Sequence, residues 1–355
     1  MPRLSESLQL HFPRLSSEDN LITGTMKTRP SDFIVDEIPA YQPSGTGEHL
    51  FLQIEKEGVS AEQLLIHLAK TLNVKRNDIG VAGLKDRHAI TRQWISVPAE
   101  CESQVSNVTT DGIRVLESRR HQNKLKTGHL HGNRFSIFIR DVLPEMIQHS
   151  LSKRDSILRL GIPNYFGDQR FGVNSETLEL GEQLLKGESN PQSIPIQKRK
   201  FLLRLALSSA QSALFNLVLA HRIREGICHR VLPGDVLQVT SSGGPFVSTD
   251  TQTDQHRFDQ REVVTSGPLF GPKMKMPVGV AAEIETQPLS EHQLTLADFQ
   301  RFKKLTTGTR RPLLLWLDQL NVAPTDNGLL FQFSLPAGAY ATVVMREFLA
   351  DEPQR

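Results

Sequence analysis

The sequence has few cysteines and no long apolar run. Its two cysteines are Cys101 and Cys228, and no Cys-x-x-Cys motif occurs. This usage argues against a disulfide framework and against a structural zinc site, and it is typical of a reducing compartment. No run of about 18 apolar residues is present to form a transmembrane helix, and the residues after Met1 lack the apolar core of a signal peptide. We therefore expect a cytoplasmic protein with no membrane partner.

The sequence also lacks a strong excess of either charge, since 41 Lys and Arg residues are balanced by 39 Asp and Glu residues. Net charge therefore does not identify a nucleic-acid partner. One local segment, the basic stretch, carries seven basic residues: Arg114, Arg119, Arg120, Lys124, Lys126, Arg134 and Arg140. Such a stretch can neutralise several phosphates, although a solvated basic surface explains it equally well.

A chain of 355 residues exceeds the usual size of a single core, so two domains are expected. Alternation of apolar and polar residues predicts strands at 32–38, 135–139 and 329–335, and a further strand is predicted at 50–54. Apolar residues recurring every three or four positions predict helices at 60–72, 202–224 and 341–348. Ser60 and Gln63 form a capping-box pattern at the start of the first helix. The polar segment 241–262 is predicted to be a loop. Strands mixed with helices in this way indicate an α+β class with a largely antiparallel sheet.

The segment Val81–Val97 places polar residues in a gap between two apolar runs. A loop between strands is where a rigid scaffold usually presents reactive groups. Lys85, Arg87 and Arg92 surround Asp86 in the sequence and would hold its carboxylate ionised, because nearby positive charge favours the charged form. An ionised carboxylate can act as a nucleophile or a base, whereas a Lys-Asp pair on a surface loop is more often simply solvated.

The string Gly83-Leu84-Lys85-Asp86, followed by Ala89, Thr91 and Gln93, resembles the signature loop of the TruD family of tRNA pseudouridine synthases. Other segments that resemble motifs of this family are Lys27–Glu37, Gly132–Phe135, Asn164–Gly172 and Phe331–Gly338. In the family, the Asp of the Lys-Asp pair is the catalytic nucleophile. The resemblance therefore assigns that role to Asp86.

The same motifs imply residues that hold a uridine. Phe33, Asn133 and Phe333 match substrate contacts, Phe135 matches a stacking neighbour in the pocket, and Lys27 matches a charged group that supports the site. An Asn side chain can donate and accept hydrogen bonds together, as the edge of uracil requires. Without the family pattern, the phenylalanines would be explained as strand core and Asn133 as a turn residue.

The resemblance also implies the fold and the reaction. It predicts a pseudouridine synthase catalytic domain with a mainly antiparallel sheet, formed by residues 1–160 and 308–355, and an inserted α+β domain, the TRUD domain, at residues 161–307. The implied reaction is the conversion of uridine to pseudouridine at position 13 in the D arm of tRNA, with no cofactor and no metal. The expected partner is tRNA rather than DNA, and the chain is expected to be a monomer.

Two other functions are compatible with the sequence. One is a non-catalytic RNA-binding protein of the same fold. The other is a carboxylate-based hydrolase of a glycosidic bond, which would need a second acid about 5–10 Å from Asp86; Glu37 is the candidate for it. Whether Asp86 would attack C1′ of the sugar or C6 of the base is also open.

Overall fold

The computed structural model describes residues 2–9, 12–19 and 21–350. The chain forms two compact units. Unit 1 comprises Met1–Ser17, Leu160–Trp316 and Thr342–Glu347, and unit 2 comprises Glu18–Arg159, Leu317–Ala341 and Phe348–Arg355. Each unit therefore combines segments that are distant in the sequence.

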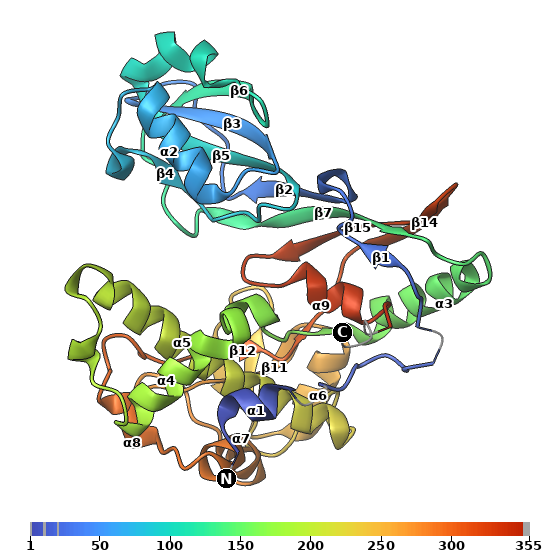
Figure 1. Ribbon diagram of the computed structural model, residues 1–355. Helices are drawn as coiled ribbons and strands as arrows, with labels where there is room; N and C mark the ends of the chain where they lie inside the picture. Colours follow the sequence, from blue (N-terminus) through green and yellow to red (C-terminus); the bar gives the residue numbers. More distant parts are fainter. Residues whose placement is uncertain (1, 10–11, 20, 351–355) are drawn as a thin grey trace. The chain divides into compact units, whose positions relative to one another are not determined.

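Unit 2 contains a nine-stranded sheet (Figure 1). Its strands are β1 (Thr25–Met26), β2 (Phe33–Pro39), β3 (His49–Glu57), β4 (Gly80–Val81), β5 (Ile90–Pro98), β6 (Ile113–His121), β7 (Leu130–Arg140), β14 (Leu320–Thr325) and β15 (Gly328–Pro336). Its helical segments are η1 (Pro30–Asp32), α2 (Ala61–Thr71), η2 (Arg76–Asp78), η3 (Ala99–Val108) and α3 (Glu145–Leu160). The last residue of α3, Leu160, is also the first residue of the unit 1 segment Leu160–Trp316. The four strands predicted from the sequence are confirmed as β2, β3, β7 and β15.

The order of strands in this sheet is β14-β15-β7-β2-β5-β3-β6, with β1 paired to β7 and β4 paired to β5. Every pairing is antiparallel except that of β2 with β5, which is parallel, with Ile34 opposite Ile90. Because β2 and β5 run in the same direction, the segments that precede them meet at one edge of the sheet. These two segments contain Lys27 and Asp86.

One face of β3, β5 and β6 forms the main hydrophobic core of this half of the sheet. Leu50, Leu52 and Ile54 of β3 pack there against α2, which lies across these strands in Figure 1. The helix begins with the predicted capping box, in which Ser60 and Gln63 each accept a hydrogen bond from the backbone N–H of the other.

Unit 1 has a four-stranded antiparallel sheet and a two-stranded one. The larger sheet has the order β10 (Pro245–Val247), β9 (Val236–Val239), β11 (Val263–Leu269) and β12 (Thr309–Pro312), and the smaller pairs β8 (Ile162–Pro163) with β13 (Leu314–Leu315). The helical segments are α1 (Leu4–Gln9), η4 (Asp168–Arg170), η5 (Val173–Ser175), α4 (Glu176–Lys186), η6 (Pro191–Ser193), α5 (Ile196–Arg224), α6 (Thr251–Asp259), α7 (Val280–Glu291) and α8 (Leu296–Gln300). The predicted C-terminal helix is α9 (Ala341–Arg346), which begins at the last residue of a unit 2 segment and continues into unit 1.

The long helix α5 is the centre of the unit 1 core. Leu203, Leu207, Ala210 and Leu214 pack in one buried cluster with residues of α4 and α7. The helix is long and apolar enough to cross a membrane by length and composition, but 72% of its most apolar window is buried inside the protein. Burial of this extent is typical of a core helix.

The prediction that residues 241–262 form a loop is wrong. The segment contains β10 and the helix α6, whose first turn is capped by Asp250 through hydrogen bonds from the backbone N–H groups of Gln252 and Thr253. The helix escaped prediction because its only apolar residue is Phe258, which is buried. Its stability comes from this cap and from packing rather than from a periodic apolar face.

The compact units and the expected domains differ in their bounds. Unit 1 includes residues 1–17, 308–316 and 342–347, which the domain prediction groups with the catalytic domain. All the residues predicted to act on the substrate lie in unit 2. The division into a catalytic and an inserted domain stays a prediction.

Candidate active site

Asp86 lies in the loop that connects β4 to β5, and its side chain is 52% exposed. The carboxylate atom Oδ2 is 3.9 Å from Nζ of Lys27, in the segment before β2. The parallel pairing of β2 with β5 explains why two residues far apart in sequence meet here. The side chain of Lys27 is 28% exposed, and its backbone adopts a positive φ of 61°.

Lys27 also connects Asp86 to a row of three aromatic rings. Its Nζ lies 4.2 Å from the centroid of the Phe33 ring. Phe33 packs edge-on against Phe135 at 6.1 Å between centroids, and Phe135 stacks on Phe333 at 5.6 Å. We call Phe33, Phe135 and Phe333 the aromatic row. Its members come from β2, β7 and β15 and are 3–7% exposed, so they form a packed apolar cluster that Lys27 links to the carboxylate.

The strand register explains why the aromatic row lies on one face of the sheet. Phe135 is directly opposite both Val35 and Phe333 in the ladder, and side chains alternate between faces along each strand. Asn133 therefore shares the face of Phe135, two residues before it. Its Oδ1 is buried and has no hydrogen-bond partner among the residues that the structure describes. The same is true of Thr91 Oγ1 and Gln93 Oε1 in β5, on the same face.

The prediction that Lys85, Arg87 and Arg92 hold the Asp86 carboxylate is wrong, because each of these side chains bonds to another group. Lys85 donates a 2.9 Å hydrogen bond to Glu37, Arg87 donates to the backbone carbonyl oxygen of Gly58, and Arg92 bonds to carboxylates on the other face of the sheet. None of the three forms an ion pair with Asp86 in the described part of the chain. Lys27, which is 59 positions earlier in the sequence, occupies that place instead.

One residue of the site, Lys56 at the end of β3, was not predicted from the sequence. Its side chain is fully buried, and its Nζ donates hydrogen bonds of 2.6 Å to the carbonyl oxygen of Asp86 and 2.8 Å to that of Val59. Burial lowers the pKa of Lys56 to about 8, against an opposing influence of the Asp86 charge. In the sequence Lys56 stands between Glu55 and Glu57, a pattern typical of a solvated charge run, so no sequence signal identified it.

Lys85 and Glu37 form a buried ion pair next to the reactive loop. Their side chains are 6% and 1% exposed, and Glu37 also accepts a hydrogen bond from the backbone N–H of Trp94. The pair fixes the residue that precedes Asp86 to strand β2. Glu37 is thus occupied, and it lacks the free access that a second catalytic acid would need.

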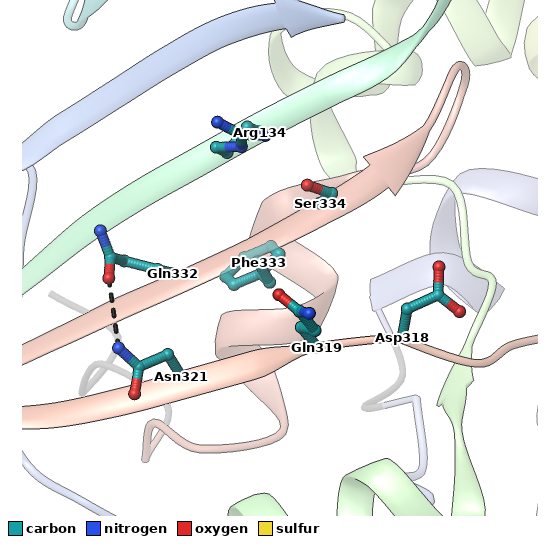
Figure 2. Close-up of a pocket in the computed structure, with 7 residues that line it drawn as sticks. All are labelled: Arg134, Asp318, Gln319, Asn321, Gln332, Phe333 and Ser334. Carbon is teal, nitrogen blue, oxygen red and sulfur yellow. Dashed lines mark hydrogen bonds between the residues drawn. The ribbon is translucent and has the colours of Figure 1, made fainter.

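A groove of about 620 Å³ lies at the outer end of the sheet, beside Phe333 (Figure 2). Its lining is otherwise polar: Arg134, Asp318, Gln319, Asn321, Gln332 and Ser334. Asn321 donates a hydrogen bond to Gln332 across β14 and β15, drawn as the dashed line in Figure 2. These amides, the hydroxyl and the guanidinium give the groove donors and acceptors suited to a polar ligand.

The basic stretch is largely neutralised within unit 2. Four of its arginines form ion pairs: Arg114 with Glu55, Arg119 with Glu117, Arg120 with Glu102, and Arg140 with Asp32. Lys124 donates to the carbonyl oxygen of Asn77. Lys126 and Arg134 have no partner within the described ranges, and each lines a pocket. Lys126 and Arg134 are thus the two cations of the basic stretch whose side chains are free of partners in the described residues.

The family model described as tRNA pseudouridine synthase D (TruD) matches residues 11–192 and 197–348. The chain is 40% identical over 326 residues to tRNA pseudouridine synthase D of Anaeromyxobacter sp. (strain Fw109-5), covering 92% of both chains. It is 37% identical over 346 residues to a tRNA pseudouridine synthase D of Thermus thermophilus, covering 96% of this chain and 93% of the relative.

A solved structure gives the same result for the fold. The crystal structure of a Methanosarcina mazei protein that carries the TruD assignment superposes with a TM-score of 0.77 and covers 98% of both chains, at 24% sequence identity. With the mainly antiparallel sheet of unit 2, this similarity confirms the predicted α+β fold.

Proposed function

Because the chain belongs to the TruD family of tRNA pseudouridine synthases, we propose that it converts uridine to pseudouridine at position 13 in the D arm of tRNA, with Asp86 as the nucleophile. The reaction breaks the bond from N1 of uracil to C1′ and forms a bond from C5 to C1′. N1 gains a proton and C5 loses one, so the atoms balance without an oxidant, a reductant or a transferred group. The proposal therefore includes no cofactor and no metal.

The observation that carries this proposal is the contact of Asp86 with Lys27 at the end of the aromatic row. The half-exposed carboxylate is open to a nucleoside, and the ammonium of Lys27 lies 3.9 Å from it. When RNA covers the site and excludes water, the attraction between the two charges becomes stronger. An ionised carboxylate held in this way can attack either C1′ or C6.

The aromatic row and the orphaned polar atoms supply a place for the extruded base. A uridine must leave its stack to reach an enzyme's catalytic group, which costs a few kcal/mol. Apolar contact with Phe33, Phe135 and Phe333 would compensate for part of this cost. Oδ1 of Asn133 and Oε1 of Gln93 lack hydrogen bonds in the described residues, and each can accept one from the N3–H of uracil.

The proposal also covers partner, location and assembly. We propose that tRNA binds unit 2 through the free cations Lys126 and Arg134, and that the protein acts as a cytoplasmic monomer without contact to DNA or membrane. The cysteines Cys101 and Cys228 are buried and free, which is consistent with a reducing compartment.

The test is incubation of the protein with an unmodified tRNA transcript, followed by mapping of pseudouridine by sequencing. We expect the wild type to modify position 13. Asp86→Asn should lower the rate by at least about 1000-fold, since a carboxamide cannot serve as the nucleophile. The control Asp111→Asn makes the same change at an exposed turn and should keep full activity. Wild-type rates in Asp86→Asn would support a role other than catalysis by Asp86. Absence of pseudouridine with the folded wild type would defeat the enzyme proposal and favour the RNA-binding alternative. Release of free uracil would favour the hydrolase.

A further inference from the structure

Lys126, one of the two free cations of the basic stretch, lies beside a pocket that the reaction does not use. This pocket is on the loop between β6 and β7 and has a volume of about 530 Å³, within the range of roughly 300–1,000 Å³ that is usual for small-ligand sites. Among its eight lining residues are two lysines and three histidines, and none is Asp or Glu. The lining thus favours an anionic ligand. We call this cavity the histidine pocket.

Rings form one wall of the histidine pocket. Tyr41 stacks on His121 at 5.0 Å between centroids, and the Tyr41 hydroxyl is hydrogen-bonded to Nδ1 of His129 at 2.7 Å. His121 in turn packs against the buried ring of Phe51 at 4.8 Å. Burial and the neighbouring His49 lower the pKa of His121. Rings that are fixed by packing are suitable surfaces for stacking a nucleobase.

Polar groups at the mouth of the histidine pocket are unused. Gln122, Asn123 and Lys126 are exposed, and their side chains have no partner in the part of the chain that the structure describes. Nδ1 of His49 is buried in the same wall and also lacks a hydrogen bond there. Amide groups can pair with the edge of a base, and an ammonium can pair with a phosphate.

The loop that forms the histidine pocket is connected to the reactive loop. The backbone N–H of Gly128 donates a 2.9 Å hydrogen bond to the carbonyl oxygen of Ala82, immediately before Gly83. Leu125 and Ala82 also pack in one buried cluster with Trp94. A ligand in the pocket would therefore contact the segment that supports the start of the Asp86 loop.

We propose that the histidine pocket binds one nucleotide of the substrate tRNA other than the target uridine, with the base against the imidazole and tyrosine rings and its phosphate on Lys126. This inference rests on the proposed function for the identity of the RNA. Each part of a nucleotide has a matching group in the pocket: the rings match the base, the free amides match its edge, and the unpaired Lys126 matches the phosphate. The lining contains no carboxylate that would repel the phosphate. A protein ligand would instead require an apolar contact area or acidic side chains that match the lysines.

The test measures binding of an unmodified tRNA transcript at several salt concentrations for Lys126→Ala, Asn123→Ala and the control Lys70→Ala. Lys70 is an exposed lysine on α2, outside the histidine pocket. We expect Lys126→Ala to weaken binding about 5- to 10-fold and to reduce the slope of log K against log salt by about 0.9, the contribution of one phosphate. Asn123→Ala should weaken binding by about threefold with an unchanged slope, since a neutral contact releases no counterion. Lys70→Ala should match the wild type.

The outcomes separate the two proposals. If the wild type modifies tRNA but Lys126→Ala and Asn123→Ala bind like Lys70→Ala, the nucleotide site is overturned and the enzyme proposal stands. If the wild type binds tRNA without forming pseudouridine and the two variants weaken binding as expected, the site stands and the enzyme proposal falls. If the slope of log K against log salt is the same for Lys126→Ala and the wild type, Lys126 does not contact a phosphate, even if the variant binds more weakly.

Discussion

Nζ of Lys56 donates a 2.6 Å hydrogen bond to the backbone carbonyl oxygen of Asp86, the residue proposed as nucleophile. A second hydrogen bond, to the carbonyl oxygen of Val59, fixes the ammonium at the end of β3. The contact is made through the backbone, so it leaves the Asp86 carboxylate open. Lys56 is therefore a positioning residue, which determines where the reactive loop lies without contacting the substrate.

Replacement of Lys56 by Met should lower kcat by about 10- to 100-fold while the Kd for tRNA stays within about twofold. Loss of the two hydrogen bonds lets the Asp86 backbone move, and a misplacement of about 1 Å can cost on the order of 100-fold in rate. The measurements are single-turnover rates at saturating tRNA and filter binding, with Lys70→Met as control for an exposed lysine. A folded Lys56→Met protein with wild-type kcat would contradict the positioning role.

The pKa of Lys56 predicts a change of stability with pH. Burial lowers it from 10.5 to about 8, so between about pH 8 and pH 10.5 the unfolded chain carries a proton that the folded protein has released. The free energy of unfolding from this group therefore rises with pH in that window, by on the order of 1 kcal/mol per pH unit. Lys56→Met lacks this contribution, so urea unfolding at increasing pH should show its stability falling relative to the wild type. If the difference in the free energy of unfolding between Lys56→Met and the wild type is constant from about pH 8 to pH 10.5, the prediction is wrong.

Lys27→Met should reduce kcat by about 10- to 100-fold and change the free energy of unfolding by less than about 0.5 kcal/mol. The ion pair with Asp86 is partly exposed, and such pairs contribute little to stability. Its effect on the reaction is larger, because bound RNA excludes the water that screens the two charges. Single-turnover kinetics and thermal unfolding of the same sample separate the two effects. Equal losses of activity and stability would indicate a structural role instead.

The buried pair of Glu37 and Lys85 should behave differently from an exposed one. Glu37→Leu leaves a buried ammonium without a partner, so we expect it to lower the free energy of unfolding by about 3–5 kcal/mol. The double variant Glu37→Leu/Lys85→Met should recover most of this loss, which a double-mutant cycle measures. As a control, Glu62→Ala breaks the exposed pair with Arg76 and should cost less than about 1 kcal/mol. Additive effects at Glu37 and Lys85 would be inconsistent with the coupling.

Arg134→Ala should weaken tRNA binding and reduce its salt dependence by about one phosphate. Arg134 lies in the groove of Figure 2 with no partner inside the described ranges, so its charge is available to an anion. Lys75→Ala removes one charge at an exposed position outside this groove and serves as control. If the two variants have the same salt slope as the wild type, Arg134 does not contact the RNA backbone.

The strands and the capped helix could be predicted because their signals are local. Alternation identified β2, β7 and β15, and the capping box at Ser60 marked the start of α2. The family pattern likewise brought together Asp86, Lys27 and the aromatic row, and their mutual contacts fit that selection. Their roles in the reaction stay predictions until the variants are measured.

Partner choice could not be predicted, because it depends on tertiary contacts. Lys85, Arg87 and Arg92 are close to Asp86 in sequence, yet each side chain leaves the loop or strand in a direction that leads to another group. Lys56 shows the same limit in another way. Its flanking glutamates predict an exposed side chain, but the strand pairing buries it. The helix α6 was missed for a related reason, because a capping Asp and one buried Phe are too weak a pattern.

The aromatic row has a consequence for how the protein is made. Phe33 and Phe333 come from strands at opposite ends of the sequence. Phe33 reaches Phe135 when β2 pairs with β7, whereas Phe333 reaches it only when β15 pairs with β7. Pairing over such a separation requires closure of a very long loop, which is slow. During synthesis on the ribosome, a nascent chain that still lacks β15 has only part of this apolar cluster, so an amino-terminal fragment should be unable to modify RNA before the last strand is in place.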